Sequence, residues 1–361
     1  MAPSRSVGEW QAIALEAVRA FAASERAFTV MELEARLSDV QFQDFPPILP
    51  HHLTTARQTM QSRGELLYSF ERTRGGSHVA LLTAADKPKA TGRAAARKRL
   101  LYTRYLGWTQ SSAEWNPAPV PAGLEMVVHA SLREAAPWGY GLVKPEGGEV
   151  RRLFGAAVPG GPMDNAAFLT KVDPTMSAPP QTTTILIEAK NLRQWIYPRT
   201  QEMYQLLSKA VSLQVKHPGA RFVPVLVCRR INRITGTMAR QIGAHLIETK
   251  TQYVRPTVLN IDDGQRKFDE VNAELGFNLT LSDGGNRNMR DQFTTTLPNR
   301  VDDAAERWHA FAHHPDVPDL VARLRDDEID STLRRHTIAE LGSAVEDVTS
   351  ETVRWAGSEF S

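Results

Sequence analysis

Two carboxylates and a lysine stand where two successive strands of a predicted sheet begin and end. The apolar run Ile185-Leu186-Ile187 is followed by Glu188 and Lys190, and Asp164 follows a Gly-Gly-Pro turn just before the preceding strand. Strand alternation puts Glu188 and Lys190 on one face. If the two strands are neighbours, Asp164 lies beside this pair. Two carboxylates with open positions suit Mg²⁺, and the lysine can orient an attacking water and stabilise charge on phosphorus.

The Glu-x-Lys pattern is short, and the chain contains a second copy at Glu248-Thr249-Lys250. We reject this copy because the run 245–254 alternates polar and apolar residues like a half-exposed strand. It also lacks an acid at the entrance of a preceding strand. Asp173 is a rival to Asp164, but it precedes a proline at a strand's exit, which is the wrong end.

The elements between residues 120 and 255 alternate between strand and helix patterns, which predicts a mixed α/β sheet flanked by helices. Helices are expected from Leu124 to Ala136, from Pro198 to about Lys216 and from about Thr235. Strands are expected at Gly139–Val143, Val150–Val158, Asn165–Val172, Thr182–Ala189, Phe222–Cys228 and His245–Val254.

The pattern Asp-x(n)-Glu-x-Lys within this order of elements resembles the PD-(D/E)XK nuclease superfamily, over about residues 120–255. The resemblance implies a restriction-endonuclease-like fold and Mg²⁺-dependent hydrolysis of phosphodiester bonds. It implies that Asp164 and Glu188 bind the metal and act in catalysis with Lys190. Glu134, on the helix before the first strand, is the expected further catalytic acid. Gln201, Tyr204 and Gln205 fall near the place where many members carry a supporting Gln or Tyr.

Residues 8–86 are predicted to form three helices closed by a β-hairpin, an order that resembles a winged helix. The helices are expected at 8–24, after Thr29 with a capping box to Glu32, and at His51–Arg63. The strands are expected at Glu65–Arg72 and Ser77–Thr83. The resemblance implies DNA contact through the third helix and the wing. The expected contact residues are Arg57, Gln58, Gln61, Arg63 and Arg74.

A run of basic residues follows this domain. Residues 87–104 contain seven Lys or Arg and no acid, and they are predicted to form a linker followed by a helix. Arg97 and Lys98 of this run are expected to contact DNA phosphates. Residues 1–255 carry 32 Lys and Arg against 20 Asp and Glu, whereas residues 256–361 carry 11 against 21. This asymmetry predicts a polyanion-binding body with an acidic appendage that covers it or forms a dimer interface.

The C-terminal region is expected to be mostly helical, at Asp302–His313, Val317–Asp326 and Leu333–Leu341, with a loop at Ser282–Arg290. The predicted organisation is therefore a winged-helix-like domain (1–86), a basic linker and helix (87–110), a PD-(D/E)XK nuclease-like domain (111–256) and an acidic region (257–361). The single cysteine, Cys228, excludes an internal disulfide. No apolar run is long enough for a membrane helix, and the N-terminus does not read as a signal peptide, so we expect a cytoplasmic protein.

These patterns together predict a Mg²⁺-dependent endonuclease for double-stranded DNA, of the restriction or defence type, in which the winged helix selects the site. Cutting both strands is compatible with a homodimer. Two other hypotheses remain open. One is a non-catalytic DNA-binding regulator on a nuclease-like fold, and the other is a repair or recombination nuclease that recognises DNA structure.

Overall fold

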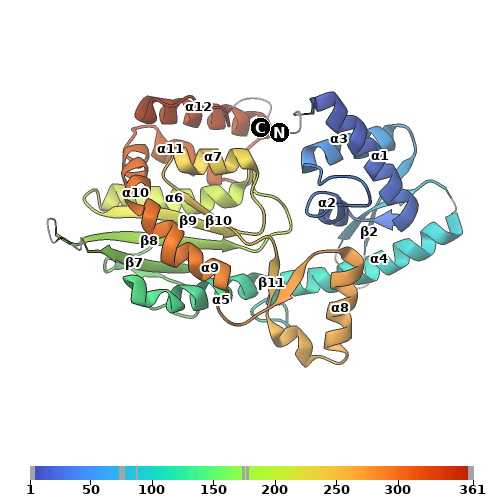
Figure 1. The fold of residues 1–361 in the computed structure, drawn as a ribbon, viewed down its shortest axis with the longest axis horizontal. Helices are drawn as coiled ribbons and strands as arrows, with labels where there is room; N and C mark the ends of the chain where they lie inside the picture. Colours follow the sequence, from blue (N-terminus) through green and yellow to red (C-terminus); the bar gives the residue numbers. More distant parts are fainter. Residues whose placement is uncertain (1–4, 73–77, 87, 173–174, 176–178, 357–361) are drawn as a thin grey trace. The chain divides into compact units, whose positions relative to one another are not determined.

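The computed structural model describes residues 5–72, 78–86, 88–172, 175 and 179–356, and the chain forms two compact units (Figure 1). Unit 1 contains Met1–Val120 and Val254–Thr280, and unit 2 contains Pro121–Tyr253 and Leu281–Ser361. The acidic region 257–361, which the sequence analysis treats as one segment, is divided between the two units. No helix in the described part of the chain is long and apolar enough to cross a membrane.

Unit 1 combines helices with a small antiparallel sheet. Its helices are α1 (Val7–Glu25), α2 (Val30–Leu37), α3 (Pro50–Ser62), α4 (Pro88–Thr109) and α8 (Gly264–Leu275), with a 3₁₀ turn at Pro256–Asn260. Its strands are β1 (Ala27–Phe28), β2 (Leu66–Arg72) and β3 (His78–Ala84), in the order β1-β3-β2. The two predicted strands pair as a hairpin, from Leu66 with Ala84 to Arg72 with His78. Strand β1 was not predicted, because two residues are too few to show a periodicity.

Two local predictions for unit 1 were wrong. The side chain of Thr29 caps α2 by accepting a hydrogen bond from the Glu32 amide at 3.1 Å, but Glu32 does not complete a capping box. Its side chain is fully buried and binds Lys98 instead. The described part of the basic run also differs from the predicted linker, because α4 is already helical at Pro88. Proline is tolerated there because the first turn of a helix does not use its amide hydrogens.

Unit 2 is built on a five-stranded mixed sheet with the strand order β10-β9-β8-β7-β4. These strands are β4 (Tyr140–Leu142), β7 (Asn165–Lys171), β8 (Gln181–Lys190), β9 (Arg221–Cys228) and β10 (His245–Glu248). The pairs β8–β9 and β9–β10 are parallel, and β7 is antiparallel to both of its neighbours. A mixed α/β fold was therefore correctly predicted.

Helices cover both faces of this sheet, which explains why residues 183–189 of β8 and 222–228 of β9 are buried without alternation. One face packs against α6 (Gln201–Lys216) and α7 (Arg233–Gln241). Outside them, α11 (Val317–Arg325) packs on α6 and α12 (Ser331–Thr349) packs on α11, and both helices extend the same core (Figure 1). The other face packs against α5 (Pro119–Glu134), α9 (Arg287–Asp291), a π-helical turn at Gln292–Thr296 and the first half of α10 (Leu297–Ala312).

Three segments of this region have a different secondary structure from the one predicted from the sequence. The run 245–254 is not one strand, because Lys250 adopts a positive φ of 62° and separates β10 from β11 (Gln252–Val254). The run 150–158 is a short hairpin of β5 (Arg152–Leu153) and β6 (Ala156–Ala157). The predicted loop 282–290 ends in α9, and β12 (Leu279–Leu281), which pairs with β11, was not predicted.

The acidic C-terminal region is not an appendage. In unit 2, Trp308, Val321 and Leu341 of its helices are fully buried in the core that covers the sheet. In unit 1, Val271 and Leu275 of α8 are fully buried as well. Removing residues 257–361 would therefore expose the cores of both units, which corrects the prediction of a detachable acidic cover.

Candidate active site

The antiparallel pairing of β7 and β8 brings Asp164 and Glu188 together. The register pairs Asn165 with Ile187, so Asp164, one residue before β7, lies across from Glu188. Gly160 and Gly161 adopt positive φ angles of 74° and 110°, which turns the chain into β7. Cross-strand neighbours on one face lie roughly 5 Å apart. The sequence prediction that these two carboxylates converge is thus matched by their positions in the sheet.

Glu188 is a buried carboxylate held between two lysines. Its side chain is only 2% exposed. Lys190, two residues along the same strand, places its Nζ 3.4 Å from Glu188 Oε2. Lys209 of α6 donates to Glu188 Oε1 and to the carbonyl oxygen of Pro162. A buried charge needs such partners, because an unpaired carboxylate loses its hydration without compensation.

Asp164 is held at the same place by the main chain. Its Oδ2 accepts a hydrogen bond of 2.6 Å from the amide of Ala189. Burial, and after it the charge of Glu188, raise the pKa of the Asp164 carboxyl, while the Ala189 amide opposes this rise. Two carboxylates therefore share a site in which one of them resists ionisation. A divalent cation between them would relieve this repulsion.

A third carboxylate near this pair comes from α5, and it is Glu125. Burial raises the pKa of Glu125. The charge of Lys190 opposes this rise, whereas the charges of Glu149 and Glu188 add to it. Glu125 therefore interacts electrostatically with both Lys190 and Glu188 of the candidate site. One turn along α5, His129 Nδ1 lies 3.0 Å from the side-chain oxygen of Asn165, next to Asp164.

The predicted acid, Glu134, lies elsewhere on the same helix. It is nine residues further along α5, a separation of about 14 Å. Its side chain is exposed and lies against Gly285. The structure therefore does not bring Glu134 together with Asp164, Glu188 and Lys190.

The residues expected on the following helix have other roles. Tyr204 is buried and donates to the carbonyl oxygen of Pro198 at 2.6 Å. Gln201 donates to the carbonyl oxygen of Arg325 at 3.0 Å. The side chain of α6 that reaches the carboxylates is Lys209, which sequence reasoning missed. The sequence did contain a signal for Lys209. This lysine falls at helical spacing between Leu206 and Leu213, on the apolar face of the helix, where a charged residue is unusual.

The donor set is of the right kind for Mg²⁺, since it consists of carboxylate oxygens, and Asp164 and Glu188 are the side chains that would hold the ion. In the described part of the chain, no group of three or more His, Cys, Asp or Glu side chains is arranged to hold a metal. Two protein carboxylates leave positions for water and phosphate oxygens, which Mg²⁺ commonly keeps.

The predicted DNA-contact residues of α3 differ in accessibility. Gln58 and Arg63 are exposed. Arg57 and Gln61 are partly buried and bind each other, with Arg57 Nη1 donating to Gln61 Oε1 at 2.9 Å. Exposed positions recur along α3 at His51, Thr55, Gln58 and Ser62, which is the spacing of one helix face. Arg74 lies outside the described residues.

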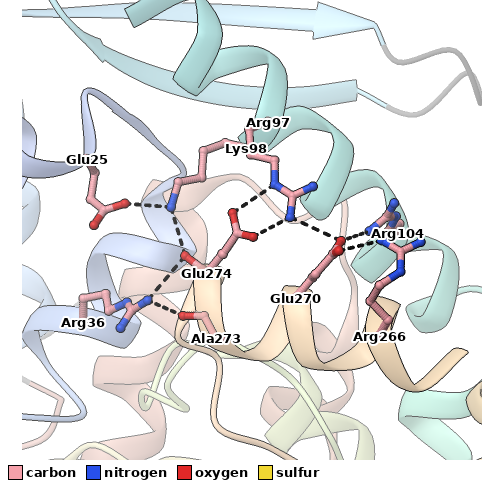
Figure 2. Close-up of polar contacts among 9 residues, drawn as sticks. All are labelled: Glu25, Arg36, Arg97, Lys98, Arg104, Arg266, Glu270, Ala273 and Glu274. Atoms are coloured by element: carbon pink, nitrogen blue, oxygen red, sulfur yellow. Dashed lines mark hydrogen bonds and ion pairs between the residues drawn. The ribbon is translucent and has the colours of Figure 1, made fainter. Parts of the chain in front are cut away.

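Arg97 and Lys98 are engaged inside unit 1. Lys98 is 5% exposed and binds the carboxylate of Glu32. Figure 2 shows its other two bonds, to Glu25 at 2.9 Å and to the carbonyl oxygen of Glu274 at 2.9 Å. Arg97 forms a two-pronged ion pair with Glu274 and lies 3.2 Å from Glu270. These carboxylates neutralise the buried Lys98 and also Arg97, whose side chain is 38% exposed, so neither residue offers an unpaired charge to DNA.

Comparisons with known proteins do not assign this chain to a family. No protein-family model, no curated protein and no solved structure matches this chain.

Proposed function

We propose that this protein is a Mg²⁺-dependent DNA endonuclease of the restriction or defence type. The observation that carries the proposal is the position of Asp164 across from Glu188, with Lys190 on the same strand as Glu188. In this proposal, unit 2 is a restriction-endonuclease-like domain. Its order of α5, the antiparallel strands β4, β7 and β8, helix α6 and the parallel strand β9 supports that interpretation.

Each side chain has a separate task in the proposed reaction. Asp164 and Glu188 hold the cation, which supplies Lewis-acid stabilisation of the phosphate when it is bound. Lys190, with a side chain that is 23% exposed, orients the attacking water and stabilises negative charge that develops on the phosphate oxygens. Lys209 positions Glu188 by holding its second oxygen. Glu125 adds negative charge that favours cation binding.

Unit 1 is the proposed DNA reader, as a winged-helix-like domain. Its helices α1, α2 and α3 and the β2–β3 hairpin follow the order of that domain. The exposed face of α3 carries polar side chains that suit phosphates and base edges, among them Gln58 and, just past the helix end, Arg63.

Cleavage of plasmid and genomic DNA, methylated and unmethylated, tests this proposal. The wild type and the variants Glu188→Gln and Lys190→Ala are compared in Mg²⁺ and in EDTA. Glu202→Gln, on the first turn of α6, is the control. We expect discrete fragments from the wild type and the control in Mg²⁺ only, and a loss of at least about 100-fold in the two site variants. Equal cleavage by Glu188→Gln would overturn the proposal.

One observation favours a second candidate, a non-catalytic DNA-binding regulator on a nuclease-like fold. Both oxygens of Glu188 already have lysine partners, which neutralise the carboxylate without a metal. For this candidate, the wild type shifts duplex DNA in a gel equally in Mg²⁺ and EDTA and cuts none of the DNAs.

A further inference from the structure

Two adjoining hollows lie in unit 2 beside the edge strand β10. One measures about 340 Å³ and the other about 310 Å³. They share Arg240, Ala244, His245 and Arg300 in their linings, so they adjoin, and we treat them as one groove. We call it the arginine groove. Its walls come from α7, β10, α10 and the segment after α12 that carries Glu351.

Every carboxylate that lines the arginine groove already has an arginine partner. Asp303 and Glu351 both bind Arg307, at 3.1 and 2.8 Å. Glu248 lies 3.6 Å from Arg230 and also accepts a hydrogen bond from the amide of Ile231. Each acidic side chain of the lining thus has an arginine within 4 Å, and Asp303 and Glu351 share the same one.

Three further arginines of the lining form no ion pair within 4 Å with any described residue, although Arg240 donates hydrogen bonds to the Gly236 carbonyl oxygen and to Thr237 Oγ1 on its own helix. Arg233, Arg240 and Arg300 are exposed, and none has an ion-pair partner in the part of the chain that the structure describes. They stand on two different helices, α7 and α10. The first turn of α7 also lines the groove, and the positive end of a helix dipole favours an anion there.

The groove also has a buried histidine in its lining. His245 is 7% exposed, and its Nε2 has no hydrogen-bond partner among the described residues. Burial, and after it the charge of Arg300, lower the pKa of His245 to about 4. The imidazole is therefore neutral near pH 7, and the groove offers both unpaired positive charge and an unsatisfied polar group.

The lining of the arginine groove reaches the same end of the sheet as the carboxylate pair, because Glu248 of β10 is in register with Lys190 of β8. Cys228 of β9 pairs with Lys190 on one side and with Glu248 on the other. Neighbouring strands lie about 4.8 Å apart, so Glu248, in the groove lining, is about 10 Å from Lys190 across the sheet. A polyanion that reaches Lys190 can therefore extend over the groove.

We propose that the arginine groove binds backbone phosphates of the DNA strand that flanks the cleavage site. This inference rests on the proposed nuclease function, because the ligand is taken to be the same DNA. Two joined hollows with arginines on separate helices suit several phosphates spaced along a strand better than one small anion. Arginine suits this task because its planar fork donates two parallel hydrogen bonds to a phosphate.

Duplex binding in EDTA, measured by fluorescence anisotropy over a range of salt concentrations, tests the inference without cleavage. The variant Arg233→Ala/Arg240→Ala/Arg300→Ala is compared with the wild type. Arg287→Ala/Arg335→Ala, which removes two exposed arginines outside the groove, is the control, and urea unfolding confirms that each variant is folded. We expect the triple variant to bind about tenfold or more weakly. We expect its slope of log K against log salt to be shallower by about 3, because each lost phosphate contact removes about one released counterion.

The corresponding Lys variant and two competitors complete the test. Arg233→Lys/Arg240→Lys/Arg300→Lys keeps the charges, so it should retain most of the slope. An unchanged affinity and slope in the triple Ala variant, with cleavage by the wild type intact, would overturn this inference alone. Displacement of DNA by inorganic phosphate or a mononucleotide at micromolar concentration would also overturn it, in favour of a small-ligand site. Absence of any duplex binding by the wild type would remove the nuclease proposal as well.

Discussion

Lys209 of α6 contacts Glu188 of β8 and the carbonyl oxygen of Pro162, two residues before Asp164. A single side chain thus connects the two segments that carry the carboxylates. The Lys209 side chain is 11% exposed, so this ion pair is shielded from water. Its geometry makes Lys209 a positioning residue for the proposed site, and it gives the first prediction.

Replacement of Lys209 by Met should destabilise unit 2 by about 3 kcal/mol, because it leaves a buried carboxylate with only Lys190 as a partner. Urea-induced unfolding measures the change. Lys216→Met, an exposed lysine in the last turn of the same helix, is the matched control and should change stability by less than about 0.5 kcal/mol. Equal stability of the two variants would show that the ion pair is not a significant support of Glu188.

The second prediction separates two acids of α5. Glu125→Gln should weaken Mg²⁺ activation of cleavage by roughly tenfold, because it removes a negative charge that interacts with Lys190 and Glu188. Glu134→Gln is the same chemical change about 14 Å away on the same helix and should leave activation unchanged. The measurement is cleavage rate against Mg²⁺ concentration. The reverse ranking would restore Glu134, the acid expected from the sequence, to the site.

The central pair of the candidate site was predictable from the chain alone, because it depends on local rules. Glu188 and Lys190 share a face by strand alternation, and Asp164 enters the neighbouring strand of an antiparallel pair. Lys209 and Glu125 were not predictable in the same way. Each comes from a helix whose rotation against the sheet is set by packing, which a single sequence does not specify.

The basic run shows a second limit of sequence reasoning. Arg97, Lys98 and Arg104 belong to the run that indicated a polyanion-binding surface, yet each is paired in unit 1 with carboxylates from distant parts of the chain (Figure 2). Glu270 and Glu274 of α8 lie more than 160 residues away from these cations in the sequence. Charge counted along the chain therefore overstates the charge that is available at the surface.

The third prediction concerns the turn between α7 and β10, beside the arginine groove. Gly243 has a positive φ of 77°, and a Cβ there would lie against the carbonyl oxygen of Ala304 and the amide of Trp308 in α10. Gly243→Ala should therefore destabilise unit 2 by about 3 kcal/mol or more, through backbone strain and a clash with rigid main chain.

Gly155→Ala separates these two contributions. Gly155 has a similar φ of 79°, but a Cβ there would meet no atom of the described residues within 4 Å. It should cost only the strain of about 1 kcal/mol. Urea unfolding of both variants measures the difference. Similar losses in the two variants would contradict the close packing of α10 on this turn.

The fourth prediction links the buried pair of Glu32 and Lys98 to pH. Burial raises the pKa of the Glu32 carboxyl to about 7 from its ordinary value of 4.5, and the charge of Lys98 opposes this rise. An acid with a raised pKa in the folded state stabilises that state below its unfolded pKa, and this contribution is lost as the pH rises through the folded pKa. Glu32 therefore reduces the stability of unit 1 progressively between about pH 4.5 and 7.

Removing the cation should make this pH dependence steeper. Lys98→Met leaves Glu32 uncompensated, so the variant should lose about 3 kcal/mol or more relative to the wild type at pH 8 and clearly less at pH 5, where Glu32 is protonated. Lys89→Met, an exposed lysine of the same helix, is the control and should show no such trend. The free energies of unfolding of the wild type and the two variants, measured at pH 5 and pH 8, test this pH dependence. A loss for Lys98→Met that is the same at pH 5 and pH 8 would mean that Glu32 keeps its ordinary pKa, and that Lys98 stabilises unit 1 by packing and by its bonds to Glu25 and Glu274.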